Sequence, residues 1–263
     1  MQLSDFIKER LSLEEYSFSI DELSRLSQKE KKRLKTDLAY LTKKGDIVPL
    51  RKGFYLIIPP RYSQQGKLPI QLYSEKLFKN LNRPYYLGLY SAAKFHSASH
   101  QQIQRDYVIT TKPRMLDIKK NTIDVRFFTT AHWPEKNINI KKADAGTYKI
   151  SDPILTAVDL IHCQNKLGGL NRILSVLEEL IEEMTPSDME ALLTWYSNKS
   201  TLQRFGYLLE VLEAENCLVE KLSNYFNSKK YYPVLLSPES KQKAGAVNNY
   251  WKIDVNIKLE SDI

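Results

Sequence analysis

The sequence predicts an α+β protein with an N-terminal winged helix-turn-helix, followed by a mixed α/β domain that includes an acidic helical bundle. Three observations carry this prediction. A strongly basic helical segment near the N-terminus runs directly into two short β-prone segments. Alternating strand-like runs continue to residue 150. Leucine-rich segments with helical spacing and many glutamates then occupy residues 151–228.

The basic segment carries clear helix signals. Ser27 and Glu30 form a capping box, which predicts that a helix begins at Gln28. Gly45, placed behind two lysines, predicts the end of this helix. The leucines of the segment recur at helical spacing and define one narrow apolar face; they are Leu34, Leu38 and Leu41.

The remaining faces of this helix carry the candidate DNA-binding side chains. The candidates on or next to the helix are Gln28, Lys29, Lys32, Arg33, Lys35, Thr36, Tyr40 and Lys43. Two strands are expected after it, Ile47–Leu50 and Phe54–Ile58. The turn between them adds two more candidates, Arg51 and Lys52, and Gly53 supplies the turn geometry.

Charge is concentrated in this segment. Between Arg25 and Lys52 the sequence has ten Lys/Arg and three Asp/Glu, in a chain whose net charge is +8. A helix with an apolar face and a cationic outer face, followed by a basic hairpin, is typical of a winged helix-turn-helix. Such a helix enters the major groove of double-stranded DNA, and the wing reaches flanking phosphates. The alternative is a solvated lysine face on an ordinary helix.

Two further helices are expected before the basic helix. One spans Leu3–Leu11, and Ser19 caps the other in a capping box with Glu22. These elements complete a DNA-binding domain at residues 1–60. A polar linker, residues 61–69, leads to a C-terminal domain at residues 70–263. That domain is expected to contain a basic α/β part (70–150), an acidic helical part (151–228) and terminal strands (229–263).

The basic α/β part combines helices and strands. A helix is expected over Ile70–Leu81, and a second, rich in small residues, within residues 84–106. Strands are expected at residues 107–111, 122–130, 137–141 and 146–150. Cations between the strands form either a second phosphate-contacting face or a solvated edge that prevents aggregation. The residues of this second basic face are Lys112, Arg114, Lys119 and Lys120.

The acidic part reads as a helical bundle. Ser151 as N-cap with Pro153 in the first turn predicts one helix. Gly168-Gly169 and Pro186 mark the starts of two more, and residues 202–211 form another. Its acids are solvated faces, or they repel DNA and so keep this part away from the duplex. A last strand is expected at residues 250–257.

Signatures of catalysis are missing from the sequence. It has no P-loop, no GxSxG elbow and no HExxH motif. His96 and His100 have a spacing that suits two metal ligands, but no cysteine or carboxylate of matching spacing accompanies them, so capping or packing is the alternative. Cys163 falls on a helix expected to be buried, where a thiol is inert. We therefore expect a binding protein without metal or other cofactor, and not an enzyme.

Composition places the expected protein in the cytoplasm. The pI near 9.2 favours an anionic partner. The two cysteines lack CxxC spacing, which indicates a reducing compartment. The apolar runs are far shorter than the roughly 20 residues of a membrane span, so no membrane contact is expected.

Several motifs together resemble the AbiE-type abortive-infection antitoxins, over residues 5–235. The motifs are RKGFYLI, YYLGLYSAAKFHSASHQ, DYVITTKPR, IDVRFF and KISDPILTAVDLI. The resemblance implies the transcriptional regulator of a type IV toxin–antitoxin system in phage defence. Such a protein would bind repeats in its own promoter and repress it. Residues 70–263 would act as the antitoxin domain against a nucleotidyltransferase toxin encoded beside it, and direct contact with that toxin is not required.

Two other functions stay open on the residues alone. One is a nucleic-acid-processing enzyme, such as a nuclease, that a winged helix directs to its substrate. The other is a protein-interaction module whose basic helix is only a solvated face.

Overall fold

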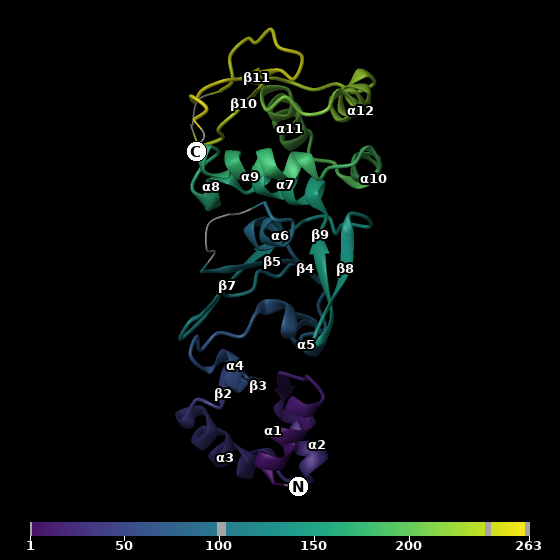
Figure 1. Ribbon diagram of the computed structural model, residues 1–263. Coiled ribbons are helices and arrows are strands. Elements are labelled where there is room, and N and C mark those ends of the chain that lie inside the picture. The colour runs from purple at the N-terminus through teal and green to yellow at the C-terminus, as the bar shows by residue number, and fades with distance from the viewer. Residues whose placement is uncertain (1, 99–103, 240–242, 261–263) are drawn as a thin grey trace. The chain divides into compact units, whose positions relative to one another are not determined.

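The computed structural model describes residues 2–98, 104–239 and 243–260 and has a mixed α/β architecture (Figure 1). The chain divides into two compact units. Unit 1 comprises Met1–Tyr86, Gln104–Ala131 and Ile140–Lys149, and unit 2 comprises Leu87–Ile103, His132–Asn139 and Ile150–Ile263. The domain limits expected from the sequence stay a prediction, because compactness alone does not mark where a chain folds independently.

The N-terminal residues of unit 1 form three helices and a small sheet. The elements are α1 (Leu3–Ser12), β1 (Ser17–Ser19), α2 (Ile20–Ser27), α3 (Lys31–Lys44), β2 (Ile47–Arg51) and β3 (Phe54–Ile57). The strands pair antiparallel in the order β1-β3-β2. The three helices and the hairpin agree with the sequence analysis, whereas β1 was not predicted.

A compact apolar core joins these elements. Phe6 of α1 meets Phe18 of β1 edge to face, with the ring centroids 5.2 Å apart. Leu34 and Leu38 of α3 are 1% exposed and pack in the same cluster. Two of the three leucines of the predicted apolar face therefore lie in this core, and Leu41 packs against it partly buried.

Two predicted helix starts are wrong, and side-chain hydrogen bonds explain both. The Ser27 hydroxyl donates to the Leu23 carbonyl at 2.7 Å inside α2, so it does not cap the next helix. Gln28 ends α2 in the left-handed conformation with φ 55°, and α3 begins three residues later. The second wrong start is that of α7, where the N-cap is Asp152 and not the predicted Ser151. The Asp152 carboxylate accepts a hydrogen bond from the Leu155 amide at 2.8 Å.

The predicted cap at Ser19 is confirmed. Its hydroxyl accepts a hydrogen bond from the Glu22 amide at 3.0 Å. The Glu22 carboxylate forms ion pairs with Arg10 and Lys76, each at 3.2 Å. The Glu22 carboxylate therefore ties α2 to α1 and α5.

Short helices follow the hairpin. They are α4 (Pro60–Ser63), the 3-10 helix η1 (Ile70–Leu72) and α5 (Ser74–Asn80). The helix expected over Ile70–Leu81 is thus divided at Tyr73, whose φ of −139° interrupts it. The predicted linker begins within α4, and the Gly66 carbonyl accepts from the Thr122 hydroxyl at 2.7 Å.

A six-stranded sheet has the order β6-β7-β5-β4-β9-β8. Its strands are β4 (Tyr85–Leu87), β5 (Asp106–Thr110), β6 (Ile118–Lys120), β7 (Ile123–Thr129), β8 (Ile138–Ala143) and β9 (Gly146–Ser151). β5 and β7 pair parallel, β6 and β7 antiparallel, and Leu87 pairs with Ile150 in a parallel register. The four strands expected between residues 107 and 150 are present, and β4 and β6 add to them.

Unit 2 is mostly helical. Its helices are α6 (Leu89–Phe95), α7 (Pro153–His162), α8 (Gln164–Leu167), α9 (Asn171–Glu182), α10 (Pro186–Trp195), α11 (Lys199–Val211) and α12 (Asn216–Asn227). The α7 helix is the most enclosed, with nine consecutive residues buried. None of the described helices combines the length and apolar content that a membrane span needs.

The terminal strand is much shorter than predicted. Only β11 (Ile253–Asp254) forms, parallel to β10 (Val234–Leu235). Both backbone groups of Ile253 bond to the Asn249 side chain, at 2.6 and 2.9 Å. These bonds make residues 249–252 a turn, which places Trp251 in the core with no exposed surface.

Candidate nucleic-acid interface

The outward face of α3 carries a row of polar and cationic side chains. Lys32, Arg33, Lys35, Thr36 and Lys43 are exposed, as is Lys29 just before the helix. Tyr40 is 68% exposed, which is high for an aromatic ring. Seven of the predicted side chains thus share the solvent-facing side of one segment, opposite Leu34 and Leu38.

Most cations of this face lack a local counter-charge. Lys31 pairs with Asp21, and Lys44 pairs with Asp46 at 2.9 Å. The other cations of this face form no ion pair with the described residues; they are Lys29, Lys32, Arg33, Lys35 and Lys43. An anionic partner would therefore meet positive charge that the protein itself does not neutralise.

The segment that joins α2 to α3 is tightly held. Gln28 is exposed and sits in the left-handed turn between the helices. The Ser24 hydroxyl donates to the Lys29 carbonyl at 2.7 Å, which fixes this turn. Gln28 therefore lies before α3. The sequence predicted it in the first turn of this helix.

The two cations of the β2–β3 turn have different surroundings. Lys52 is exposed, and Gly53 holds the turn with φ 75°. Arg51 instead donates to the Leu116 carbonyl, and its guanidinium lies 5.1 Å from the centroid of the Phe127 ring. Burial lowers the pKa of Arg51, and the nearby Arg83 acts in the same direction. Arg51 thus anchors the turn inside unit 1, and Lys52 is the cation that the turn presents to solvent.

The second basic face is also part of unit 1. Lys112, Arg114, Lys119 and Lys120 are all exposed and form no ion pair with the described residues. Sequence reasoning missed Arg83, which donates to the carbonyls of Thr111 and Pro113. No local pattern marks Arg83, because its partners lie 28 and 30 residues further along the chain.

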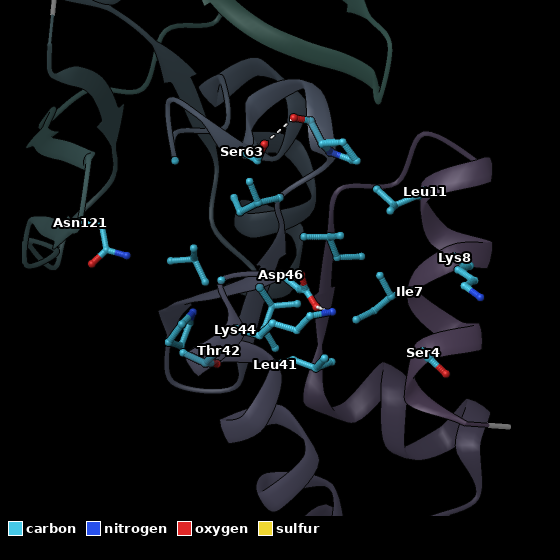
Figure 2. Close-up of a pocket in the computed structure, with 18 residues that line it drawn as sticks. Ser4, Ile7, Lys8, Leu11, Leu41, Thr42, Lys44, Asp46, Ser63 and Asn121 are labelled. Atoms are coloured by element: carbon cyan, nitrogen blue, oxygen red, sulfur yellow. Dashed lines mark hydrogen bonds and ion pairs between the residues drawn. The ribbon is translucent and has the colours of Figure 1, made fainter.

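A pocket of about 710 Å³ lies beside the C-terminal end of α3 (Figure 2). Ile7 and Leu11 of α1 and Leu41 of α3 give it apolar walls. Its polar groups include the Lys44–Asp46 ion pair and, on the side of the six-stranded sheet, Asn121. The pocket therefore separates the end of α3 from the turn between β6 and β7.

Unit 2 contains a buried polar cluster. Asn137 donates to the Asp152 carboxylate at 2.7 Å and to the Asp188 carbonyl at 2.9 Å, and its own carbonyl oxygen accepts from the Trp195 indole at 2.9 Å. Burial raises the pKa of Asp152 to about 7, although the bonds from Leu155 and Asn137 oppose the shift. This cluster joins the segment before β8 to α7 and α10.

The groups considered for metal binding or nucleophilic chemistry lie in structural positions. His96 is 6% exposed, and its Nε2 bonds to the Ser151 carbonyl at 2.8 Å. His100 lies outside the described residues. Within the described part of the chain, no group of three or more His, Cys, Asp or Glu side chains is placed to hold a metal ion. Burial raises the pKa of the Cys163 thiol to about 12, so it is protonated at neutral pH.

Two comparisons with known proteins found a similarity, one to a solved structure and one to a family model. The chain is similar to the RV2827C protein from Mycobacterium tuberculosis in its crystal structure, with a TM-score of 0.62 and 15% identity over 95% of this chain and 89% of that chain. At this identity the likeness concerns the fold. No curated protein matches the sequence. The family model of the AbiEi antitoxin C-terminal domain matches residues 86–211. This match confirms the resemblance to the AbiE-type antitoxins that the sequence motifs indicated.

Proposed function

We propose that this chain is the antitoxin of a type IV toxin–antitoxin system that acts in abortive infection and phage defence, and that it also represses its own promoter. The match to the AbiEi antitoxin C-terminal domain supports an antitoxin role and, with it, a cognate toxin. The antitoxin family is regulatory and non-enzymatic. The finer parts of the proposal are the type IV mechanism, the nucleotidyltransferase nature of the toxin and the binding of promoter repeats.

DNA binding is assigned to residues 2–58 as a winged helix-turn-helix. In this proposal α3 lies in the major groove, where Arg33 and Thr36 reach base edges and Lys32 and Lys35 reach phosphates. Lys52 on the wing contacts a flanking phosphate. The observation that carries the proposal is the row of exposed α3 cations, which form no ion pair among the described residues and lie opposite buried leucines.

The antitoxin activity is assigned to the C-terminal domain. Its helices α9, α11 and α12 carry exposed acids such as Glu182, Glu210 and Glu220. These acids repel a DNA backbone, so they favour contact with DNA through unit 1. The toxin is opposed functionally, and direct contact with it is not needed for this role.

The first experiment measures binding of the purified chain to DNA upstream of its own gene and to a scrambled fragment, at two salt concentrations. We expect specific binding, and we expect Lys32→Ala/Arg33→Ala to abolish it. The matched control is Lys94→Ala/Lys230→Ala, which removes two exposed lysines from unit 2 and should bind as the wild type does. Equal weak binding to both fragments, unchanged in the α3 variant, would contradict the proposal.

A second experiment separates repression from antitoxin activity. The chain is co-expressed with the nucleotidyltransferase encoded beside it, and growth of the host is measured. We expect Lys32→Ala/Arg33→Ala to rescue growth as the wild type does, because α3 lies outside the antitoxin domain at residues 86–211. Loss of rescue in a folded α3 variant would show that the two activities are not separate.

A further inference from the structure

The last part of unit 2 reverses the charge of the helices before it. Residues 172–220 contain three Lys/Arg and ten Asp/Glu, whereas residues 221–258 contain seven lysines and two acids. Three of these lysines, Lys229, Lys230 and Lys252, form no ion pair with the described residues. Positive charge therefore stays unneutralised at this end of a unit whose preceding helices are acidic.

Aromatic rings gather in the same segment. The ring of Phe226, which is buried in α12, lies 5.5 Å from the ring of Tyr225 and 4.7 Å from the ring of Tyr231, measured between centroids. The Tyr231 hydroxyl donates to the Tyr250 carbonyl at 2.7 Å, and the Tyr250 hydroxyl donates to the Ser223 carbonyl at 2.8 Å. These bonds hold the two tyrosines beside α12, so a ligand would lose little entropy in ordering them.

Two tyrosines of this segment present their rings to solvent. Tyr232 is 66% exposed and Tyr250 is 43% exposed. The main chain at Tyr232 is fixed, because its carbonyl accepts a hydrogen bond from the Gln203 side chain at 2.9 Å. Water on an exposed ring is released when a flat apolar group stacks against it.

Lysines lie against or beside these rings. The ammonium of Lys229 is 4.1 Å from the centroid of the Tyr225 ring, and that of Lys252 is 4.3 Å from the centroid of the Tyr231 ring. Lys230, which precedes Tyr231 in the chain, is exposed. Single-stranded nucleic acids are bound by this combination, because bases stack on aromatic rings while cations bind the phosphates between them.

We infer that this segment forms a binding surface for single-stranded nucleic acid, in which bases stack on the tyrosines and the lysines bind phosphates. This tyrosine–lysine surface consists of Lys229, Lys230, Tyr231, Tyr232, Tyr250 and Lys252. All six residues belong to unit 2, whereas the proposed promoter contact belongs to unit 1.

The chemistry of the tyrosine–lysine surface distinguishes among partners. In a double helix the bases already stack on one another, so their faces are closed to a tyrosine ring. A protein partner fits less well, because lysine is depleted at protein–protein interfaces and three lysines lie among these rings. Most single-stranded nucleic acid in a cell is RNA, and proteins recognise unpaired RNA bases by stacking them on aromatic side chains. RNA is therefore the expected ligand.

The experiment measures the affinity of the purified full chain for a labelled RNA strand of about 12 nucleotides, by fluorescence anisotropy. The same sequence is tested as a DNA strand and as duplex DNA. We expect the wild type to bind the RNA strand and Tyr232→Ala to raise Kd by about tenfold, through the loss of one stacked base. Tyr232→Phe keeps the ring and should bind as the wild type does. Because the Tyr232 side chain is exposed, neither change should affect folding.

The matched control is Tyr40→Ala, because Tyr40 is 68% exposed but lies in α3. It should leave the affinity for the RNA strand unchanged, and Tyr232→Ala should leave the affinity for promoter DNA unchanged. Lys229→Ala/Lys230→Ala removes two proposed phosphate contacts. For a single strand this should reduce the slope of log K against log salt by about 1.4, whereas Tyr232→Ala should leave that slope unchanged.

Binding of strands and binding of the promoter can each fail without the other, so the two proposals are tested separately. Tighter binding of RNA than of the DNA strand would support the inference and indicate a contact with the 2′-hydroxyl. Equal binding of the two strands would support it with recognition of bases and phosphates alone. The inference is wrong if the wild type binds neither strand, or if the tyrosine and lysine variants bind both strands as the wild type does. Loss of rescue from the toxin in a Tyr232→Ala variant whose strand binding is unchanged would instead assign this surface to a protein partner.

Discussion

The α3 and α7 helices use the same backbone geometry for opposite purposes. In α3 the fully buried residues are Leu34 and Leu38, and most of the other side chains are exposed. In α7 every residue from Pro153 to Ile161 is buried. The sequence of α7 is therefore constrained by packing, whereas most of α3 is free to serve a partner.

The family match and the proposal of DNA binding rest on different regions of the chain. The family match covers residues 86–211, which include α7 and exclude α3. The match thus covers the packed α7 helix together with parts of both units. The proposal of DNA binding rests on the exposed face of α3. The two lines of argument are independent, so each can be tested without the other.

The largest expected effect is on the packed helix. Leu160 of α7 has no exposed surface, so Leu160→Ala should leave a cavity and lower the free energy of unfolding by about 3 kcal/mol. Chemical denaturation followed by circular dichroism measures this loss. The matched change on the other helix is Ala39→Gly, at an exposed position of α3, which should cost about 1 kcal/mol through backbone freedom alone. Similar losses in the two variants would remove the contrast between α3 and α7.

The next effect depends on pH and concerns the cap of α7. The pKa of Asp152 is raised by burial to about 7 from an ordinary value of 3.8. The protonated form is therefore favoured in the folded protein, and this contribution to stability is fully present below pH 3.8 and is lost as pH rises through about 7. Asp188 strengthens the shift, and Asn137 and the Leu155 amide weaken it.

Denaturation between pH 5 and pH 8 measures this dependence. The wild type should lose about 2–3 kcal/mol relative to Asp152→Asn over this range, because the asparagine does not titrate. Asp152→Asn is expected to have a lower absolute stability, since its amide meets the Asn137 amide, so the comparison concerns the slope with pH. Parallel pH profiles for the two proteins would contradict the assignment of the shift to Asp152.

The sequence predicted the elements whose signals are local. Gly45 ends α3, and the β2–β3 hairpin lies within a residue of its expected limits, because the glycines and the alternation of apolar residues act over a few positions. The start of α3 was wrong because the Ser27 hydroxyl had a competing acceptor within its own helix. The three-residue strands β1 and β4 are too short to produce a recognisable period.

The candidate site was predictable only in part for a similar reason. Exposure of Lys32, Arg33 and Thr36 follows from helical spacing against the leucines, and the structure places them as expected. The surroundings of Arg51 do not follow from spacing, because its partner Leu116 lies 65 residues away. A sequence shows which residues are cations. It does not show which of them bond to residues far away in the chain.

A smaller effect tests the end of α3. Gly45 has φ 86°, and a Cβ placed there would meet no atom within 4 Å. Gly45→Ala should therefore cost about 1 kcal/mol through backbone strain alone, without a clash. Gly45→Asn is the matched control and should cost less, because asparagine adopts this conformation more readily. Thermal unfolding measures both, and a loss of several kcal/mol in Gly45→Ala would indicate packing that the structure does not contain.

The smallest expected effect on stability is at the proposed interface itself. Lys32→Ala/Arg33→Ala should change the free energy of unfolding by no more than about 0.5 kcal/mol, because both side chains are exposed and form no ion pair among the described residues. At low salt the change should be stabilising, since two like charges are removed from a basic helix, and it should disappear as salt screens the repulsion. Denaturation of the variant and the wild type at two salt concentrations measures the change in stability. DNA binding is measured on the same samples. A variant that loses DNA binding at unchanged stability assigns these cations to the partner, whereas a variant that unfolds would assign them to the fold.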